Sequence, residues 1–592
     1  MRSRLIARWV VGALAATLFL GVTPLMADSK SGPSNVDPAL LADAKAHPDA
    51  YFQVIVRGAP SAAASNGSAL QDGATTRNRS DSESRTHKAE TVLSTSDGSR
   101  RSLAIVGGAS GALLGSQIVT LAQTPLVDRI VRDEAFTATW NADDAARAVD
   151  DVAIESVKAP MVWDSKGLSG KGITVAVVDS GVADHPDLAG RIVARVDLTG
   201  EGSKGDPGGH GTHVAGLIAG DGAASGGRWT GVAPQANIVS VRVIDATGHA
   251  KLSTIFAGLQ WVLRNRSTYH IRIANLSFGG AALSSYQNDL LASAVEMLNF
   301  SGLTVVVSAG NDGRLGASTI TTPATDPFVI TAGADDPNGT AGIKDDSVAK
   351  WSSRGPTAFD GIAKPDLVAP GRRVVGLRAA GSTLDTLYPQ LQVTAKGAKT
   401  AQYFTLSGTS MAAAIVSGVA ALYLQRRPSA TPREVKAQLT ATAHPLHDAR
   451  TGEQGAGVVD AYAAVTSKPV AAPFTTYPAS TAFAEQVFAK LFGQPIVWRD
   501  TAFNGGVDSN GIRWSDVVWA DITWDGITWE DITWEAFDWQ SITWEDITWE
   551  AFDWQSITWE DITWEDISWE GLTWEIAAPH GGSTSGSWGL VD

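Results

Sequence analysis

The sequence predicts an α/β fold in which helices cover both faces of a parallel sheet. Between about residues 160 and 465, short runs rich in β-branched residues alternate with alanine-rich segments of helical periodicity. The β-branched runs are continuously apolar, a pattern that a strand needs when it is buried on both faces. Strands that alternate with helices build parallel sheets, in which functional groups gather at the carboxyl ends of the strands.

The expected elements of this region follow from those runs. β-branched segments predict strands at residues 173–178, 238–243, 271–277 and 304–308. Helical spacing predicts helices near residues 211–220, 252–266, 286–299 and 410–427. The last helix follows a flexible glycine and is apolar along its length, so we expect it inside the core.

The first 27 residues have the order of a secretory signal peptide. Arginines precede an apolar run at residues 9–22, and Ala27 is a small residue at the expected cleavage site. The run is short for a membrane span, which needs about 18 or more apolar residues. We therefore expect a secreted or extracellular protein with no membrane span in the mature chain. An uncleaved N-terminal anchor is the alternative.

A small α+β unit is expected ahead of the main domain. Residues 51–57 have a strand pattern, and the polar stretch at 60–101 is expected to be mobile. Helical spacing of Leu126, Ile130 and Val131 predicts a helix, while residues 118–121 and 136–140 read as strands.

Charge and cysteine content exclude several classes of function. The formal charge of the 592 residues is −16, and the acidic side chains concentrate in residues 514–575, which contain no Lys or Arg. Outside that segment the charge is close to zero, so no basic footprint for nucleic acid is present. The absence of cysteine excludes disulfides, thiol catalysis and thiolate metal sites.

Three segments place reactive side chains at strand or helix ends. The first strand ends in Asp179-Ser180-Gly181, and His210 lies where a glycine-rich loop enters a helix. Ser410, in Gly408-Thr409-Ser410-Met411-Ala412, begins the apolar helix, whose free N–H groups and dipole stabilise negative charge. Ser is also preferred at such a position simply as a helix-capping residue, so the motif by itself does not distinguish a nucleophile from a cap. No zinc-ligand spacing accompanies the histidines.

Together these segments resemble the three signatures of the subtilisin-like serine peptidases, the subtilases, in the chain order Asp, His, Ser. The resemblance implies a subtilisin-like fold in which Ser410 is the nucleophile, His210 the general base and Asp179 the residue that orients the imidazole. It leaves the second histidine, His213, with a structural role. The Asn of Ala309-Gly310-Asn311-Asp312-Gly313 would donate its side-chain amide to the oxyanion. Turn formation is the alternative role of Asn311.

The resemblance also implies where substrate binds. Residues 275–280 are similar to the subtilase segment that pairs with an extended peptide, and residues 248–252 would face it. Substrate would thus be held by strand addition between the two segments. No acidic residue marks the pocket for the substrate residue before the cut, so we expect a preference for apolar residues or a broad preference at that position. The candidate binding residues are Ser277, Phe278, Gly279, Gly248 and Ala250.

Two departures from the family pattern concern Ala414 and calcium. The family usually has proline where Ala414 stands, and this change is expected to alter the partitioning of the acyl-enzyme between water and amines. Catalysis is expected to need no cofactor. Asp187, in His185-Pro186-Asp187-Leu188, matches an element whose Asp often binds a structural Ca²⁺, although the loop at 220–230 lacks a recognisable ligand pattern.

A Trp-rich repeat occupies residues 514–576. Tryptophan recurs every five residues in units that mostly read Ile-Thr-Trp-Glu-Asp, which predicts an array stabilised by its own neighbours. The tryptophans would then form the core of the array. A disordered acidic tail and a surface that binds a glycan, another cell-surface ligand or bridging Ca²⁺ are the alternatives.

These observations predict a secreted serine endopeptidase that processes itself from a zymogen, with cleavage near residues 150–160. Its partners would be protein or peptide substrates and its own propeptide. The alternative is a surface-binding or adhesive protein whose repeat is the functional module, with proteolysis limited to self-processing or one partner peptide. The expected domains are a signal peptide (1–27), a propeptide (28–155), the catalytic domain (156–466), a linker (467–513), the repeat (514–576) and a C-terminal tail (577–592).

Overall fold

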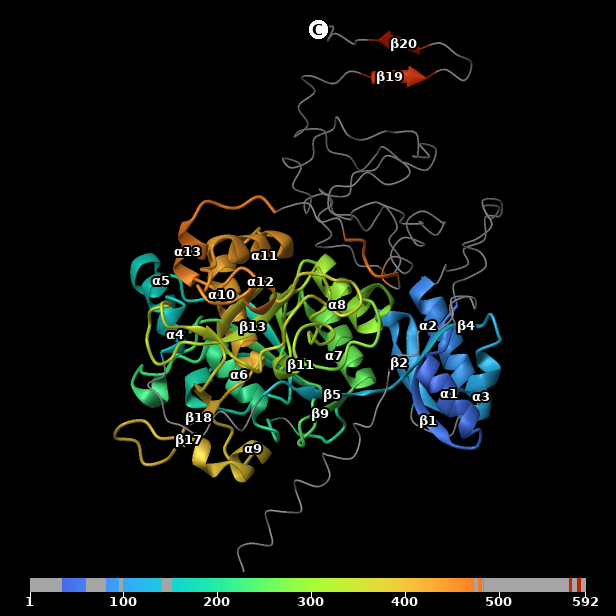
Figure 1. The fold of residues 1–592 in the computed structure, drawn as a ribbon, viewed down its shortest axis with the longest axis horizontal. Helices are drawn as coiled ribbons and strands as arrows, with labels where there is room; N and C mark the ends of the chain where they lie inside the picture. The colour runs from blue at the N-terminus through green and yellow to red at the C-terminus, as the bar shows by residue number, and fades with distance from the viewer. Residues whose placement is uncertain are drawn as a thin grey trace, which may run out of the picture.

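The computed structural model describes most of the chain between residues 35 and 472 and a few short segments beyond it (Figure 1). The described ranges are 35–59, 81–94, 100–140, 152–203, 205–472, 477–481, 483, 574–577 and 583–586. The expected signal peptide and residues 514–573 of the repeat lie outside them. In the C-terminal part, β19 (Trp574–Ala577) pairs antiparallel with β20 (Ser583–Gly586).

The N-terminal unit is a four-stranded antiparallel sheet with three helices, as the expected α+β class requires. Its strand order is β2-β3-β1-β4, and its apolar core includes Leu40, Val54 and Ile130. The elements are α1 (Pro38–Ala46), β1 (Tyr51–Gly58), α2 (Asp81–Leu93), β2 (Arg101–Leu103), β3 (Gly108–Leu114), α3 (Gly115–Leu121) and β4 (Val127–Arg132).

Three expectations for this unit were wrong. Residues 118–121, expected as a strand, belong to α3, and the segment expected to be helical is β4. The spacing misled because Leu126 lies before β4 and is exposed, while Ile130 and Val131 face two different cores. A register shift also lies in the pairing of β4 with β1, where Val127 pairs with Gly58 and Ile130 with Val56.

The third error concerns residues 81–93 of the polar stretch after β1, which form the helix α2, while residues 60–80 and 95–99 lie outside the described residues. Ala89 and Leu93, four residues apart, are buried in the core of the unit. The guanidinium of Arg85 is also buried and donates to the carbonyl oxygen of Gly58 at 3.3 Å. A mostly polar sequence therefore forms a packed helix because a few well-spaced side chains meet the sheet.

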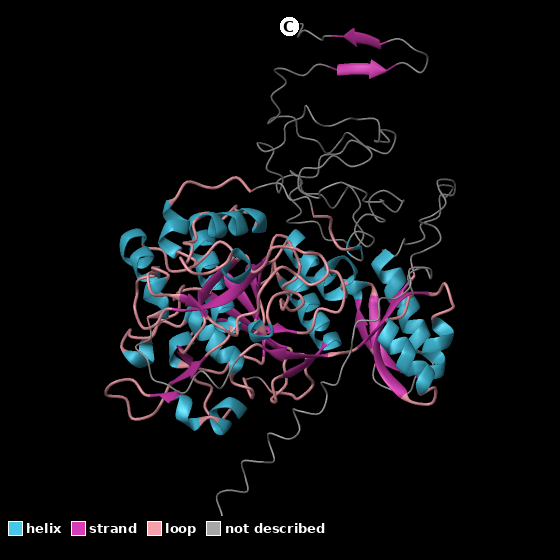
Figure 2. Ribbon diagram, in the orientation of Figure 1, coloured by secondary structure: helices cyan, strands magenta, loops and turns pink. Residues whose placement is uncertain are grey.

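The main domain is built on an eight-stranded sheet in which all strands but one run parallel, as expected (Figure 2). The strand order is β14-β13-β12-β10-β6-β8-β7, with β15 also paired to β13. The strands are β6 (Thr174–Asp179), β7 (Ile192–Asp197), β8 (Asn237–Arg242), β10 (Ile271–Leu276), β12 (Thr304–Ser308), β13 (Ile330–Asp336), β14 (Ser347–Val348) and β15 (Leu367–Pro370).

Helices cover both faces of this sheet. In β6, Val175 and Val177 face a core shared with α6 and α10, while Ala176 and Val178 face a second core shared with α7 and α8. The helices of the domain are α4 (Ala153–Ser156), α5 (Ala159–Lys166), α6 (His210–Ala219), α7 (Leu252–Asn265), α8 (Leu290–Phe300), α9 (Thr383–Leu387), α10 (Thr409–Arg426), α11 (Pro432–Ala441), α12 (Thr451–Gln454) and α13 (Ala461–Thr466). The predicted helices and strands of this domain are confirmed to within a few residues.

Two small sheets flank the carboxyl ends of the parallel strands. One contains β16 (Val374–Leu377), β17 (Gln392–Val393) and β18 (Tyr403–Leu406), and β18 leads directly into α10. The other contains β5 (Ala135–Ala138), β9 (His249–Lys251) and β11 (Phe278–Gly279). Figure 1 shows β5 running from the N-terminal unit into the main domain. This second sheet therefore joins the two parts of the molecule.

After the last helix, a short segment returns to the surface of the main domain. The backbone N–H of Ser480 donates to the buried carboxyl group of Glu296 at 2.9 Å, and the hydroxyl of Tyr286 donates to the carbonyl oxygen of Pro478 at 2.7 Å. Phe483 packs on Phe300 with ring centroids 4.8 Å apart.

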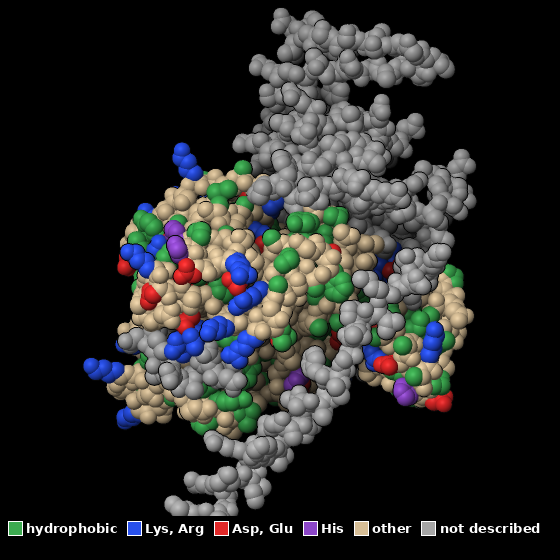
Figure 3. Space-filling model, in the orientation of Figure 1, with side chains coloured by type: hydrophobic (Ala, Val, Ile, Leu, Met, Phe, Trp, Pro, Cys, Tyr) green, Lys and Arg blue, Asp and Glu red, His purple; other side chains and the backbone are tan. Residues whose placement is uncertain are grey.

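The visible surface mixes side chains of all types. On the face in Figure 3, Lys and Arg lie among Asp, Glu and scattered hydrophobic side chains. In the ranges that the structure describes, no helix is both long enough and apolar enough to cross a bilayer.

Candidate active site

The cleft at the carboxyl ends of the strands contains a segment of the chain itself. β5 lies between β9 and β11 and pairs antiparallel with both, with Phe136 opposite Ala250 and Ala138 opposite Phe278. Two more backbone bonds continue the pairing, because Ala138 N–H donates to Gly248 O and Thr139 N–H to Ser277 O, each at 3.2 Å. The structure thus gathers the predicted binding residues around one extended strand.

Phe136 fills an apolar pocket beside this strand. Its ring is 4% exposed and meets the ring of Phe278 edge to face, with centroids 6.4 Å apart. The pocket requires glycine at position 280, since an added Cβ there would lie 2.7 Å from the Phe136 ring. The apolar side chain of Phe136, three residues before Thr139, therefore helps to hold β5 in place.

Ser410 lies at the start of α10, against the end of the bound strand. Its Oγ is 2.7 Å from the carbonyl oxygen of Thr139 and 3.0 Å from that of Ser277. The N–H of Ser410 points at the same Thr139 oxygen, at 3.4 Å. Gly408 permits this approach, because an added Cβ would lie 2.3 Å from the Thr139 oxygen. The carbonyl group of Thr139 is thus in contact with both the hydroxyl and the backbone amide of Ser410.

His210 and Asp179 form a buried hydrogen-bonded pair nearby. His210 is the first residue of α6 and Asp179 the last of β6, and their Nδ1 and Oδ1 atoms are 2.7 Å apart. The other ring nitrogen, Nε2, is buried and has no hydrogen-bond partner in the described part of the chain. It is therefore available to accept a proton.

Asp206 links the Asp179 loop to the start of α6, and the sequence reasoning missed it. Its carboxylate accepts hydrogen bonds from Ser180 Oγ at 2.8 Å, from Gly209 N–H at 2.7 Å, and from the N–H and hydroxyl of Thr212 at 2.8 and 2.6 Å. Burial raises the pKa of Asp206, although these bonds act against that shift. Asp206 stands in the glycine-rich loop just before His210, and an acidic residue close to a helix N-terminus is the sequence feature that could have identified it.

Asn311 lies after β12, facing the first turn of α10. Its Oδ1 accepts hydrogen bonds from the backbone N–H and the hydroxyl of Thr409, both at 3.1 Å. These bonds fix the orientation of the amide group, which leaves Nδ2 buried without a partner among the described residues. A buried donor without a partner, next to Ser410, is suited to a negative charge that forms during a reaction.

Comparison with known proteins identifies the family. The profile of the Subtilase family matches residues 170–464. Serine protease AprX from Bacillus subtilis (strain 168) is 42% identical over 322 residues, which cover 53% of this chain and 71% of that protein. The chain is a subtilase.

Two further proteins are similar to this chain. Subtilisin BL from Lederbergia lenta is 36% identical to the subtilase over 311 residues, which cover 52% of this chain and 97% of that protein. The crystal structure of fervidolysin from Fervidobacterium pennivorans, a keratinolytic enzyme related to subtilisin, has a TM-score of 0.52 and 22% identity and covers 72% of this chain and 62% of that one. The latter shows the shared fold. The subtilase is thus a serine-type endopeptidase that acts on protein or peptide substrates.

His213 of the subtilase lies one turn after His210 and is fully buried. Its Nε2 is 3.0 Å from the carbonyl oxygen of Phe404 and 3.2 Å from that of Val374, so this nitrogen carries the proton and donates. Burial, and secondly the charge of His210, lower the pKa of His213 to about 3. The side chain is therefore a neutral link between α6 and the strands that lead to α10.

His213 should make the subtilase less stable in acid. A histidine whose folded pKa is about 3 and whose unfolded value is 6.5 binds a proton only after unfolding, so stability is lost as pH falls from about 6.5 towards 3. The loss amounts to at most about 1.4 kcal/mol per pH unit. We expect His213→Gln, which keeps a donor, to remove this part of the pH dependence. Denaturant unfolding at pH 7 and pH 5 in a Ser410→Ala background measures it.

The control for this experiment is His87→Gln, since His87 is an exposed histidine of the N-terminal unit. That variant should keep the acid sensitivity of the parent. An identical pH dependence in the parent and in His213→Gln would contradict the assignment.

The candidate calcium ligand Asp187 is buried and already hydrogen-bonded. One carboxylate oxygen accepts from the hydroxyl of Tyr403 at 2.6 Å and the other from Ala224 N–H at 2.7 Å. In the parts of the chain that the structure describes, no group of three or more Asp, Glu, His or Cys side chains has the arrangement of a metal site. Calcium at Asp187 stays a prediction.

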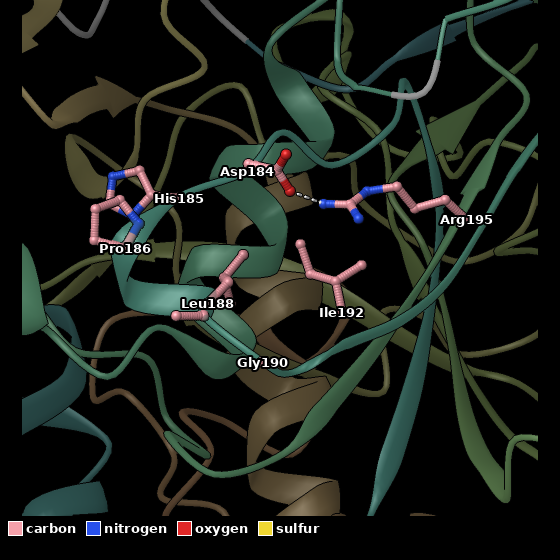
Figure 4. A pocket seen from close by; sticks show the side chains of 8 residues that line it. Asp184, His185, Pro186, Leu188, Gly190, Ile192 and Arg195 are labelled. Carbon is pink, nitrogen blue, oxygen red and sulfur yellow. Dashed lines mark hydrogen bonds and ion pairs between the residues drawn. The ribbon is translucent and has the colours of Figure 1, made fainter.

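A surface pocket lies beside this element, as Figure 4 shows. An ion pair between Asp184 and Arg195 spans it, and none of the proposed catalytic residues lines it. Its lining residues are Asp184, His185, Pro186, Leu188, Ala189, Gly190, Ile192 and Arg195.

Ala414 is fully buried in the first turns of α10, within the core that α10 shares with α6. The expected effect of this residue on acyl transfer stays a prediction.

Proposed function

We propose that the subtilase is a secreted endopeptidase that cleaves its own chain between Thr139 and Trp140 and then hydrolyses other proteins. The observation that carries the proposal is the contact of the Thr139 carbonyl group with the hydroxyl and amide of Ser410, at the end of a strand bound like a peptide substrate. The apolar segment near the N-terminus supports export.

The proposed reaction uses the four predicted catalytic residues. Ser410 Oγ attacks the carbonyl carbon, and its proton passes to Nε2 of His210, whose cation the carboxylate of Asp179 stabilises. The N–H of Ser410 and the amide of Asn311 stabilise the oxyanion. The C–N bond then breaks, and His210 gives its proton to the leaving amine. Water, activated by the same imidazole, hydrolyses the acyl-enzyme.

The position of the strand revises the expected cleavage site. The sequence alone predicted a cut near residues 150–160, whereas the carbonyl group at Ser410 belongs to Thr139. The contacts on both sides of β5 extend to Thr139. In this proposal residues 28–139 are the propeptide, and its last strand blocks the cleft.

The same contacts suggest a preference among substrates. Phe136 occupies a buried apolar pocket, and the small side chain of Ala138 lies opposite Phe278. We propose a preference for a large apolar residue three positions before the residue that supplies the cleaved carbonyl. The apolar or broad preference expected from the sequence concerns the residue directly before the cut and stays a prediction.

Mass spectrometry of the purified protein tests the cleavage site. We expect a released fragment that ends at Thr139 and a mature chain that begins at Trp140, because the Thr139 carbonyl group contacts both the hydroxyl and the backbone amide of Ser410. The fragment's C-terminus is the decisive readout, since later trimming would shorten the mature chain but leave the fragment's end in place.

Two variants serve as controls for the cleavage experiment. Ser410→Ala should remain uncut, while Ser429→Ala, an identical change at an exposed serine, should be cut as the parent is. A fragment that ends between residues 141 and 160 would contradict the Thr139–Trp140 assignment but leave self-processing standing. Equal cutting of Ser410→Ala and the parent would contradict self-processing.

A further inference from the structure

A buried and a half-buried aspartate at one edge of the main sheet have carboxyl groups without hydrogen-bond partners among the described residues. Asp335, near the end of β13, is 0% exposed. Both of its carboxylate oxygens, and both of those of Asp346 just before β14, are buried and accept no hydrogen bond from any described residue. Buried carboxylates are normally paired or bound to a metal because desolvation of an ion is costly, so four such oxygens need an explanation.

The strand pairing places the two carboxyl groups on the same face of the sheet. Asp335 lies opposite Val348 in the antiparallel β13–β14 pair. Asp346 is two residues before Val348, so it is the diagonal neighbour of Asp335 on that face. Diagonal neighbours are about 7–8 Å apart at their Cα atoms, which brings two aspartate side chains within reach of one ion.

Among the described residues, the side chains whose charges act most strongly on this pair are negative. Asp336 points to the opposite face, where Arg372 and Arg373 bind its carboxylate. Burial, and then the negative charges of Asp346 and Asp336, raise the pKa of Asp335 well above its ordinary value. Burial and the charges of Asp345 and Asp336 raise the pKa of Asp346 to about 7.

The pair differs from another pair of buried carboxyl groups in the molecule. Glu296 accepts hydrogen bonds from the N–H and hydroxyl of Ser480, and Asp326 accepts one from Phe328 N–H at 2.8 Å. Asp335 and Asp346 act on each other only through like-charge repulsion. All four of their oxygens lack a donor among the described residues, and a cation that each carboxylate contacts at about 2.3–2.6 Å would satisfy them.

We propose that Asp335 and Asp346 hold a calcium ion between β13 and β14. The ligands are carboxylate oxygens, which hard cations prefer, and no nitrogen or sulfur ligand accompanies them. Since the described residues supply no third acidic or histidine ligand here, backbone carbonyl groups of the loop at 337–346 and water would complete the six to eight oxygens that calcium takes. The ion would hold the end of β14 against β13.

The proposed site is connected to the catalytic serine by two backbone hydrogen bonds. Gly371 N–H donates to Asp335 O at 2.9 Å, and Gly408 N–H donates to Gly371 O at 2.7 Å. On the other side, Gly313 N–H, close to Asn311, donates to Trp351 O at 2.8 Å. An ion that fixes β13 and the start of the segment 347–353 would therefore stabilise both sides of the cleft.

Thermal unfolding of the full-length Ser410→Ala chain tests the proposal without self-digestion. We expect the midpoint in CaCl2, at about 100 times the dissociation constant, to exceed that in EGTA by about 3 °C or more. Asp335→Asn and Asp346→Asn should lose most of this gain. In EGTA, Asp346→Asn should unfold no lower than its parent, because the substitution removes a repulsion rather than a contact. Calorimetric titration should find one Ca²⁺ fewer in Asp346→Asn than in its parent.

The matched control is Asp345→Asn, which removes the same charge from the adjacent, exposed position. It should keep the full response to calcium and the parent's number of bound ions. The proposal is overturned if both asparagine variants at the site respond to calcium as the parent does, or if Mg²⁺ stabilises the parent as much as Ca²⁺. It is also overturned if Asp345→Asn loses the response to the same extent as Asp346→Asn.

Discussion

Replacing Ser410 with alanine is expected to lower kcat/KM for a peptide substrate roughly a millionfold, the size of effect measured when the nucleophile of a related enzyme is removed. The reason is the loss of the only Oγ that contacts the carbonyl group at the end of the bound strand. Because the backbone of α10 keeps its N–H groups, binding should survive, and KM should change much less than kcat.

The measurement uses a fluorogenic peptide that carries Phe-Thr-Ala-Thr, the residues at positions 136–139, before the leaving group. Mature chain is needed for both proteins, so the variant is expressed without residues 28–139 and supplied with that fragment in trans during folding. The parent prepared in the same way is the reference. If the kcat/KM of Ser410→Ala lies within tenfold of the parent's, Ser410 is not the nucleophile.

Substitution of Asn311 is expected to lower kcat by about 10²–10³-fold, equivalent to about 2.7–4 kcal/mol, the range found for such a donor in a relative. The amide Nδ2 is buried without a partner beside Ser410, while Oδ1 is held by Thr409. Only the transition state offers the negative oxygen that this donor needs. The loss should therefore appear in kcat, with KM little changed.

Two variants separate the donor from the structural contact. Asn311→Asp keeps an oxygen that accepts from Thr409 but loses the donor, and Asn311→Leu loses both. If the donor matters, both variants lose kcat to a comparable degree, although Asn311→Leu also unfolds at a lower temperature. If Asn311→Asp retains the parent's kcat, Asn311 has only the structural role of holding the first turn of α10.

Much of the site could be predicted because its residues lie in local sequence contexts that determine their geometry. Asp179 ends a buried strand, His210 begins a helix, and parallel strands bring those ends to one edge of the sheet. The fold class followed from the same periodicity. Each of these inferences uses residues within a few positions of one another, where spacing translates directly into structure.

The remaining features depend on pairings between distant residues. Phe136 meets Phe278, and Asp335 meets Asp346, only because particular strands lie side by side. Spacing also misled for β4, where the pattern assigns Ile130 and Val131 to one helical face although they contact different cores. No pattern within a single segment contains such information, because register is a property of two strands.

The N-terminal unit contacts the main domain through more than β5, and this affects how fast activity would appear. Arg101 donates to the carbonyl oxygen of Leu198 at 3.0 Å, and Ile105 N–H donates to the side chain of Gln260 at 3.0 Å. Before cleavage these contacts are intramolecular, so their effective concentration is high and independent of the amount of protein. Once the chain is cut, the fragment can leave, and its rebinding becomes a second-order process. The lag before full activity should therefore be shorter in dilute than in concentrated solution, because a released fragment rebinds more slowly when the protein is dilute.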